Sequence, residues 1–129
     1  MRMVGRKILI VDDDKEFLKE LREMLILSGY EVTEVSDAKA VVRTVRITKP
    51  DVILLDLRMP SISGFEVADK LKSCFETSNV PVIAMTGYYT LKEHVWLMNF
   101  CGIKRCLKKP FNPLDVIAEI ENIVGKKNE

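Results

Sequence analysis

The sequence predicts an α/β domain in which a parallel sheet of five strands is covered by helices on both faces. Short runs rich in β-branched residues alternate five times with stretches whose apolar residues recur at helical spacing. Parallel neighbours need such a crossover between them, and it is right-handed in nearly all sheets. Because 129 residues is the size of one domain, we expect a single domain over residues 1–129. Its core should run from about residue 7 to 125, with short polar tails.

The patterns of the five apolar runs assign the strands their places in the sheet. The first, third and fourth runs are apolar on both faces, as central strands of a parallel sheet are. The second run alternates and the fifth is charged at both ends, so both are expected at edges. The resulting order, 2-1-3-4-5, is flavodoxin-like. In chain order, the predicted strands are Ile8–Val11, Glu31–Val35, Val52–Leu55, Val80–Met85 and Arg105–Lys108.

Three helices are predicted from apolar stripes between the first four strands. The first should end near Ser28-Gly29, where glycine can adopt the left-handed conformation. The second should start near Ser36-Asp37 and end before Pro50. The inward side chains of the three helices, in chain order, are Phe17, Leu18, Leu21, Met24 and Leu25, then Val41, Val42 and Val45, then Phe65, Val67, Ala68 and Leu71.

The last two helices have characteristic starts. The fourth opens at Thr90-Leu91-Lys92-Glu93, which has the form of a capping box. Its segment 95–100 is more apolar than one buried face requires, so it either packs in the core or forms a partner surface with Trp96 as anchor. The fifth begins at Asn112-Pro113. Its predicted buried residues are Val116, Ile117, Ile120, Ile123 and Val124.

Composition argues against several classes of protein. Twenty basic residues against 19 acidic ones give a formal charge of +1, so we expect no binding to nucleic acid or to a membrane surface. The basic N-terminus leads only into the short run at 8–11, which predicts neither a signal peptide nor a membrane span. Cys74, Cys101 and Cys106 lack the spacing of disulfides or zinc ligands and are expected to be free, small buried residues in a reducing compartment. We therefore expect a cytoplasmic protein.

Carboxylates follow two strands that are predicted to be neighbours. Asp12 and Asp13 follow the first strand, and Asp56 follows the third. Carboxyl ends of parallel strands meet at one edge, and two like charges about 4 Å apart repel by about 4 kcal/mol at an effective dielectric of about 20. Such carboxylates raise their pKa values or recruit a cation, and oxygen ligands suit magnesium. The next acid, Asp14, is expected to cap the first helix.

Two more polar residues are expected at the same edge, namely Thr86 after the fourth strand and Lys109 after the fifth. Together with the acids they supply a carboxylate nucleophile, a metal, a hydroxyl and an ammonium, which is the composition of a phosphoryl site. Lys108 is the alternative to Lys109, because adjacent strand residues point to opposite faces; the following proline favours Lys109. His94, the only histidine, is expected at the surface, remote from the acids.

Four motifs in order at the predicted strand ends resemble the receiver domain of two-component response regulators, the CheY-like family. They are VDDD at 11–14, LLDLRMP with SGFE at 54–60 and 63–66, MTG at 85–87 and KPF at 109–111. The resemblance covers essentially the whole chain. It implies a histidine kinase or a phosphotransfer protein as phosphoryl donor. It also implies a downstream partner or a homodimer that uses the face of the fourth helix, fifth strand and fifth helix.

The resemblance assigns roles to the acids. Asp56 would accept the phosphoryl group, and Asp13, Asp56 and the backbone carbonyl of Arg58 would hold Mg²⁺. Asp12 would support the metal through water. The only expected activities are magnesium-dependent self-phosphorylation at Asp56 and autodephosphorylation, so the chain is not expected to be an enzyme for added substrates.

The resemblance also covers the fourth and fifth strand ends. Thr86 would hydrogen-bond to a phosphoryl oxygen, Lys109 would pair with one, and the Lys109-Pro110 bond would be cis. One position departs from the family, which usually keeps Tyr or Phe three residues before this lysine, where this chain has Cys106. We therefore expect activation to repack Tyr88-Tyr89 and the fourth helix instead of turning one ring.

The sequence disfavours three other interpretations. A magnesium-dependent phosphatase of the haloacid-dehalogenase type needs a second acid two residues after its nucleophile, where this chain has Arg58. A non-phosphorylated interaction module with a receiver fold would be indicated by loss of an acid or of the lysine, and all are present. A calcium loop at the acidic triplet would need glycine where Phe17 stands.

Overall fold

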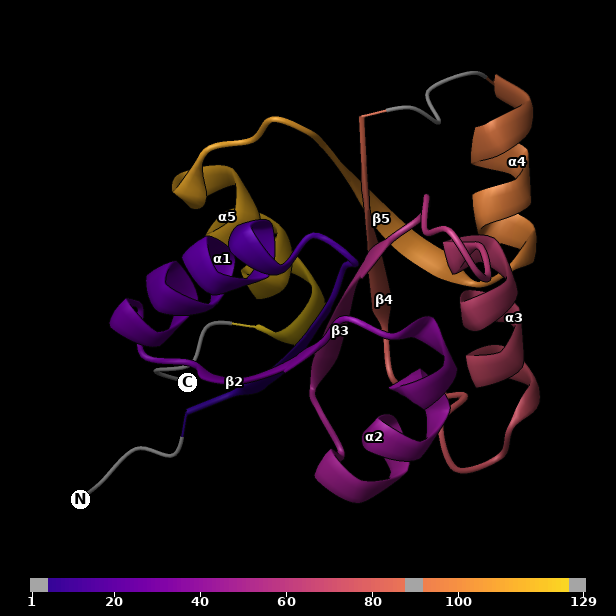
Figure 1. Ribbon diagram of the computed structural model, residues 1–129, viewed down its shortest axis with the longest axis horizontal. Coiled ribbons are helices and arrows are strands. Elements are labelled where there is room, and N and C mark those ends of the chain that lie inside the picture. The colour runs from indigo at the N-terminus through magenta and orange to yellow at the C-terminus, as the bar shows by residue number, and fades with distance from the viewer. Residues whose placement is uncertain (1–4, 88–91, 126–129) are drawn as a thin grey trace.

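The computed structural model describes residues 5–87 and 92–125, which form a three-layer α/β/α arrangement (Figure 1). Its parallel strands hydrogen-bond in the order β2-β1-β3-β4-β5, the predicted flavodoxin-like order. The two strands expected at the edges, β2 and β5, lie there. The strands are β1 (Lys7–Val11), β2 (Glu31–Val35), β3 (Val52–Asp56), β4 (Val82–Thr86) and β5 (Ile103–Lys108).

Two strand starts differ from the prediction by two residues, and β1 begins at Lys7, one residue earlier than expected. β4 begins at Val82, two residues later than expected, because the preceding Pro81 has no N–H to donate to the ladder. β5 begins at Ile103, two residues earlier than expected. Ile103 is buried and pairs with Val82, and the register then shifts past Lys104. The charged residues Lys104 and Arg105 follow Ile103 directly, so the sequence pattern did not indicate a strand start there.

The helices are α1 (Lys15–Leu27), α2 (Val41–Thr48), α3 (Gly64–Ser73), α4 (Lys92–Phe100) and α5 (Pro113–Val124). The carboxylate of Asp14 accepts hydrogen bonds from the N–H groups of Glu16 and Phe17, as expected for the cap of α1. Asn112 caps α5 in the same way. After α1, Gly29 adopts the left-handed conformation with φ 94°.

The second helix starts differently from the prediction. A 3₁₀ turn over Ala38–Ala40, capped by Asp37, precedes the α-helix, which begins only at Val41. Thr90 and the side chain of Glu93, which form the predicted capping box of α4, lie outside the part of the chain that is described.

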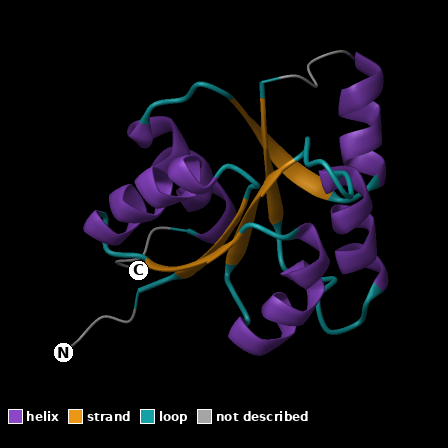
Figure 2. Cartoon of the chain, viewed as in Figure 1, coloured by secondary structure: helices purple, strands orange, loops and turns teal. Residues whose placement is uncertain are grey.

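The two faces of the sheet bury separate cores. Helices α1 and α5 cover one face, and α2, α3 and α4 cover the other (Figures 1 and 2). Along β1, Ile8 and Ile10 pack with the first pair of helices, whereas Leu9 and Val11 pack with the second group. Strand side chains alternate between faces, which explains why the central strands are apolar throughout. The carboxyl ends of the parallel strands thereby lie together at one edge of the sheet.

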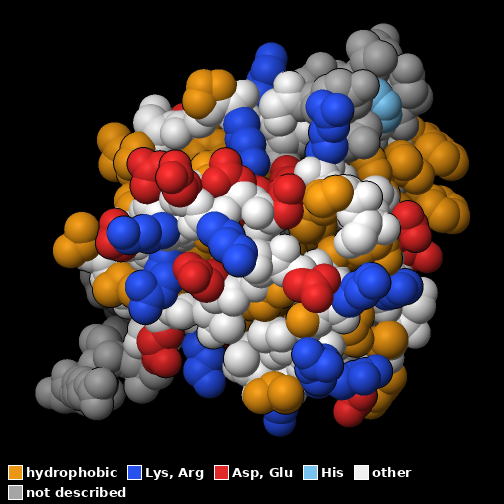
Figure 3. Space-filling view, viewed as in Figure 1, with side chains coloured by type: hydrophobic (Ala, Val, Ile, Leu, Met, Phe, Trp, Pro, Cys, Tyr) orange, Lys and Arg blue, Asp and Glu red, His pale blue; other side chains and the backbone are white. Residues whose placement is uncertain are grey.

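The surface of α4 resolves one alternative that the sequence left open. Hydrophobic side chains gather over α4, at the right of the view in Figure 3. Trp96 is 66% exposed and its ring stacks on Phe100 at 5.6 Å, whereas Met98 is buried. Trp96 is therefore a surface residue and not part of the core. His94, on the same helix, is half-buried.

The three cysteines are free, as predicted, but differ in burial. Cys101 is buried, Cys74 is half-buried and Cys106 is exposed. The prediction of a small buried residue therefore holds only for Cys101. Within the described ranges, no helix combines the length and the apolar character that crossing a membrane requires.

Candidate functional site

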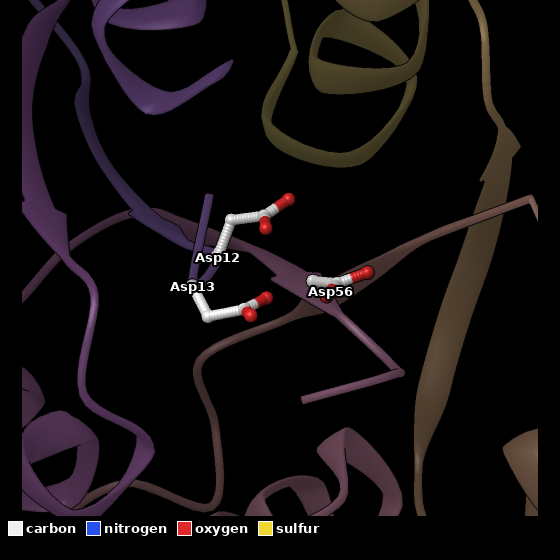
Figure 4. Close-up of side chains that lie close together, drawn as sticks. All are labelled: Asp12, Asp13 and Asp56. Atoms are coloured by element: carbon white, nitrogen blue, oxygen red, sulfur yellow. The ribbon is translucent and has the colours of Figure 1, made fainter. Parts of the chain in front are cut away.

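Three carboxylates meet at the carboxyl edge of the sheet (Figure 4). Asp12 and Asp13 follow β1, and Asp56 ends β3, which pairs with β1 in parallel. One carboxylate oxygen of each residue lies within 4.8 Å of the others. Asp12 and Asp56 are buried and Asp13 is exposed. The predicted convergence of the acids is therefore present.

Lys109 reaches the acids from the segment after β5. Its Nζ lies 2.7 Å from Asp12 Oδ2 and 3.6 Å from Asp56 Oδ1. Its backbone N–H donates to the carbonyl oxygen of Thr86 at 2.7 Å, which ties the ends of β4 and β5 together. Lys108 is exposed, so Lys109 is the lysine that faces the acids. The Lys109-Pro110 bond is cis, as the resemblance implied.

Burial and charge make Asp56 hard to ionise. Burial first, and then the negative charge of Asp12, raise the pKa of Asp56 from 3.8 to about 6. The ammonium of Lys109 and the backbone N–H of Arg58 oppose this rise without cancelling it. The ionised form of Asp56 is therefore less favourable in this pocket than in water, although it still predominates at neutral pH.

Local hydrogen bonds hold the other site residues in place. The N–H of Asp14 donates to Asp12 Oδ1 at 3.0 Å, which fixes the Asp12 carboxylate against the start of α1. Thr86 is buried as the last residue of β4, at the same edge as the acids. Arg58 is exposed, one residue beyond the buried Leu57. All residues predicted for the site therefore lie at the carboxyl edge of the sheet.

Phe17 belongs to the site, although the sequence placed it only in the apolar stripe of the first helix. The Lys109 ammonium lies over its ring, 4.2 Å from the centroid. The ring in turn meets Phe111 edge-to-face at 5.9 Å. Phe17 lies in the first turn of α1, just beyond the cap residue Asp14. Its place in the apolar stripe did not distinguish it from a core residue in the sequence.

Gly64 is a second residue whose part in the site was not recognised in the sequence. Its N–H donates to the carbonyl oxygen of Leu57 at 3.0 Å, so the start of α3 packs directly against the end of β3. A Cβ atom at this position would overlap the carbonyl oxygen of Asp56 and lie 2.6 Å from Leu57 Cα. Gly64 thus allows the close approach that frames Asp56.

A cavity of about 220 Å³ lies between α4 and β5, beside Thr86. Cys106 lines it together with Val95 and Met98. A thiol at this position fills less of this space than an aromatic ring would. Tyr88 and Tyr89 lie outside the described residues, so their repacking on activation stays a prediction.

The family model for the response regulator receiver domain matches residues 8–121. The chain belongs to this receiver family. The receiver is 29% identical over 120 residues to the polar-differentiation response regulator DivK of Brucella anthropi, covering 93% of this chain and 97% of DivK. It is 31% identical over 124 residues to the phosphate regulon transcriptional regulatory protein PhoB of Pseudomonas aeruginosa. That match covers 96% of this chain and 54% of PhoB, and the receiver spans about half the length of most regulators that it matches.

Solved structures of receivers resemble the fold closely. The chemotaxis protein CheY4 of Vibrio cholerae superposes with a TM-score of 0.87 at 26% identity, covering 92% of this chain and 98% of CheY4. The receiver domain of a sensor histidine kinase from Pseudomonas aeruginosa superposes with a TM-score of 0.84 at 28% identity, covering 95% and 99%. The fold and the two-component class of this receiver agree with the prediction.

The acidic cluster of this receiver suits a divalent metal. Its oxygen donors are hard ligands of the kind that Mg²⁺ prefers, and they lie close enough for one ion to contact a carboxylate of each residue. Burial and the neighbouring Asp12 raise the pKa of Asp56, and a bound cation would oppose that rise. The residues therefore fit a bound metal ion.

Proposed function

We propose that this receiver works in the cytoplasm as a phospho-acceptor, and that Asp56 takes a phosphoryl group from a histidine kinase or a phosphotransfer protein. The observation that carries the proposal is the position of Asp56, with Asp12, Asp13 and Lys109 around it at one edge of the sheet. A buried carboxylate is costly unless it is paired, hydrogen-bonded or bound to metal, so we interpret the cluster of three acids and a lysine as a functional site.

The proposed reaction is a transfer from nitrogen to oxygen. An Oδ atom of Asp56 attacks phosphorus and forms a P–O bond while the P–N bond to the donor imidazole breaks, and the electron pair of that bond returns to the imidazole. Lys109 places a positive charge where the equatorial phosphoryl oxygens gather negative charge. Thr86, at the neighbouring strand end, would donate its hydroxyl to one of these oxygens.

We propose Mg²⁺ as the metal. Asp13, Asp56 and the backbone carbonyl of Arg58 would hold it, and Asp12 would contact it through water. When bound, the ion supplies positive charge that offsets the carboxylates and the incoming phosphoryl group. The receiver of the sensor kinase from Pseudomonas aeruginosa is described with a magnesium ion coordinated in its active-site cleft, which supports the choice of metal.

Intact mass spectrometry after incubation with acetyl phosphate and Mg²⁺ tests the proposal. We expect a mass increase of one phosphoryl group that depends on Mg²⁺ and is absent in Asp56→Asn. Asp69→Asn, an exposed change on α3, is the matched control and should be modified like the wild type. A wild-type protein that acquires no group with either acetyl phosphate or a phosphorylated histidine donor would contradict the proposal.

The same experiment separates the two rival functions. A non-phosphorylated interaction module would give no adduct in any variant. A phosphatase would release acetate and phosphate over many turnovers without accumulating an adduct. We propose that the chain instead phosphorylates itself and loses the group slowly, with no activity on other substrates.

We propose that phosphorylation is read by a downstream protein or a second copy of the chain through the face of α4, β5 and α5. Trp96 and Leu114 are exposed apolar residues on the two helices, and such side chains often anchor interfaces. Trp96→Ala should weaken a complex that forms on phosphorylation, as measured by size-exclusion chromatography with light scattering. Phe75→Ala, which removes a ring that is 94% exposed beyond α3, should leave it unchanged.

A further inference from the structure

We infer that Phe17 is a positioning residue for phosphoryl transfer, because its ring holds the Lys109 ammonium in place beside Asp56. This inference rests on the proposed function of Asp56 and assigns a role to a residue that none of the family motifs in the sequence contains. The ring is aromatic, it comes from a different element than the lysine, and it faces the ammonium directly.

Three groups surround the Lys109 ammonium. Asp12 lies at 2.7 Å, Asp56 at 3.6 Å and the centroid of the Phe17 ring at 4.2 Å. A cation within about 6 Å of a ring centroid is attracted to the negative face of the ring, and more strongly where water is partly excluded. The Lys109 side chain is only 26% exposed, so this attraction is weakly screened.

The ring is itself held in place from two sides. Asp14 caps the first turn of α1 through the N–H of Phe17, at 3.1 Å, which fixes the backbone beneath the ring. Phe111, which follows the cis peptide bond at Pro110, contacts the ring edge-to-face. The ring therefore offers the flexible lysine one preferred position, and its loss would let the ammonium leave the acids for solvent.

The attraction in question is electrostatic, so it can be weakened without a change in shape. Mono-, di- and trifluorinated phenylalanine at position 17 withdraw charge from the ring face in steps while the ring keeps nearly the same volume. We expect the rate of phosphorylation by acetyl phosphate and Mg²⁺ to fall stepwise along the series. Phe17→Leu should lower it about threefold to tenfold, whereas Phe17→Tyr should stay within about twofold of the wild type.

The matched control is Phe100, whose ring also carries a lysine. Lys72 lies on α3, away from the acids, and its Nζ is 5.7 Å from the centroid of the Phe100 ring. The same fluorinated series at Phe100 should leave the phosphorylation rate unchanged. Equal falls at positions 17 and 100 would show a general effect of the substitutions and would overturn the inference.

A second readout needs no phosphorylation. The Lys109 Nζ lies over the ring, so we expect the adjacent ε-methylene protons to be shifted upfield in NMR spectra of the wild type and of Phe17→Tyr. In Phe17→Leu they should return to ordinary values. A wild-type protein that is phosphorylated, with rates that stay flat along the fluorinated series, overturns the role of Phe17 but not that of Asp56. A wild-type protein that is never phosphorylated overturns both, and ordinary Lys109 shifts in the wild type overturn the contact itself.

Discussion

The Lys109 ammonium lies closer to Asp12 than to Asp56, at 2.7 Å against 3.6 Å. The side chain of Asp12 is only 2% exposed, so this carboxylate depends for its compensation on the charge of Lys109 together with the N–H of Asp14. In the proposed function, the Lys109 ammonium must pair with a phosphoryl oxygen once Asp56 carries a phosphoryl group. Lys109 therefore stabilises the folded protein through Asp12 before phosphorylation, and in the proposed function it also offsets the charge of the phosphoryl group during transfer.

Lys109→Met should destabilise the metal-free protein by about 2 kcal/mol near neutral pH. Breaking a fully buried ion pair costs roughly 3–5 kcal/mol, and the partial exposure of Lys109 reduces that cost. Urea unfolding in the presence of a chelator measures the effect. Lys108→Met, one residue away and exposed, is the control and should change stability by less than about 0.5 kcal/mol. Equal stability of the two variants would show that Asp12 does not depend on Lys109.

Asp56→Asn should make the metal-free protein more stable at neutral pH. The pKa of Asp56 is about 6 in the folded protein against an ordinary 3.8, so the folded state binds the proton more tightly than the unfolded chain does. That stabilisation is complete below the ordinary pKa and is lost as the pH rises through about 6, which amounts to about 2–3 kcal/mol. Asn does not titrate, so the free energy of unfolding of Asp56→Asn should not show this loss as the pH rises.

Unfolding in urea with chelator from about pH 4.5 to about pH 7.5 tests this linkage. The variant and the wild type should approach each other at the acidic end and separate by about 2 kcal/mol at the upper end. Asp69→Asn should follow the wild-type curve at every pH. A variant that is less stable than the wild type at pH 7.5 would show that the ionised carboxylate is well compensated.

Much of this site was predictable because its residues are marked locally. Asp12, Asp13 and Asp56 each interrupt an apolar run, and the order of the strands follows from which runs are apolar on both faces. Asp14 and Asn112 stand directly before apolar residues at helical spacing, so both helix caps were also predictable from the sequence. These features depend on residues that are close together in the sequence, so hydrophobic periodicity and the residue types at caps and turns predict them well.

Features that depend on distant neighbours were not predictable in this way. Phe17 has the same spacing as a core residue, and only the folded chain brings the Lys109 ammonium over its ring. Gly64 matters because the backbone of β3 passes close to it. The choice between Lys108 and Lys109 was open for a related reason, since the chain leaves the strand there and simple alternation no longer applies.

Mg²⁺ should stabilise the wild-type protein, and Asp13 should be needed for this effect. A ligand at 100 times its dissociation constant adds about 2.7 kcal/mol to the free energy of unfolding. Asp13→Asn removes a charged oxygen ligand and should lose most of that gain in thermal or urea unfolding with and without Mg²⁺. Asp14→Asn is the control, because Asn also caps helices and should retain the gain. A magnesium effect of equal size in both variants would place the ion elsewhere.

Gly64→Ala should destabilise the protein and slow phosphorylation, whereas Gly87→Ala should leave stability nearly unchanged. The new Cβ at position 64 would meet backbone atoms of Asp56 and Leu57, which cannot move without displacing Asp56, the proposed phosphoryl acceptor. Forced overpacking of this kind costs about 1–3 kcal/mol. At Gly87 the nearest atoms to a new Cβ belong to Lys109 at 3.6 Å, an ordinary contact. Urea unfolding measures the effect on stability, and the rate of adduct formation with acetyl phosphate measures the effect on phosphorylation. If Gly64→Ala is as stable and as rapidly modified as Gly87→Ala, then α3 can move away from β3 at little cost in free energy.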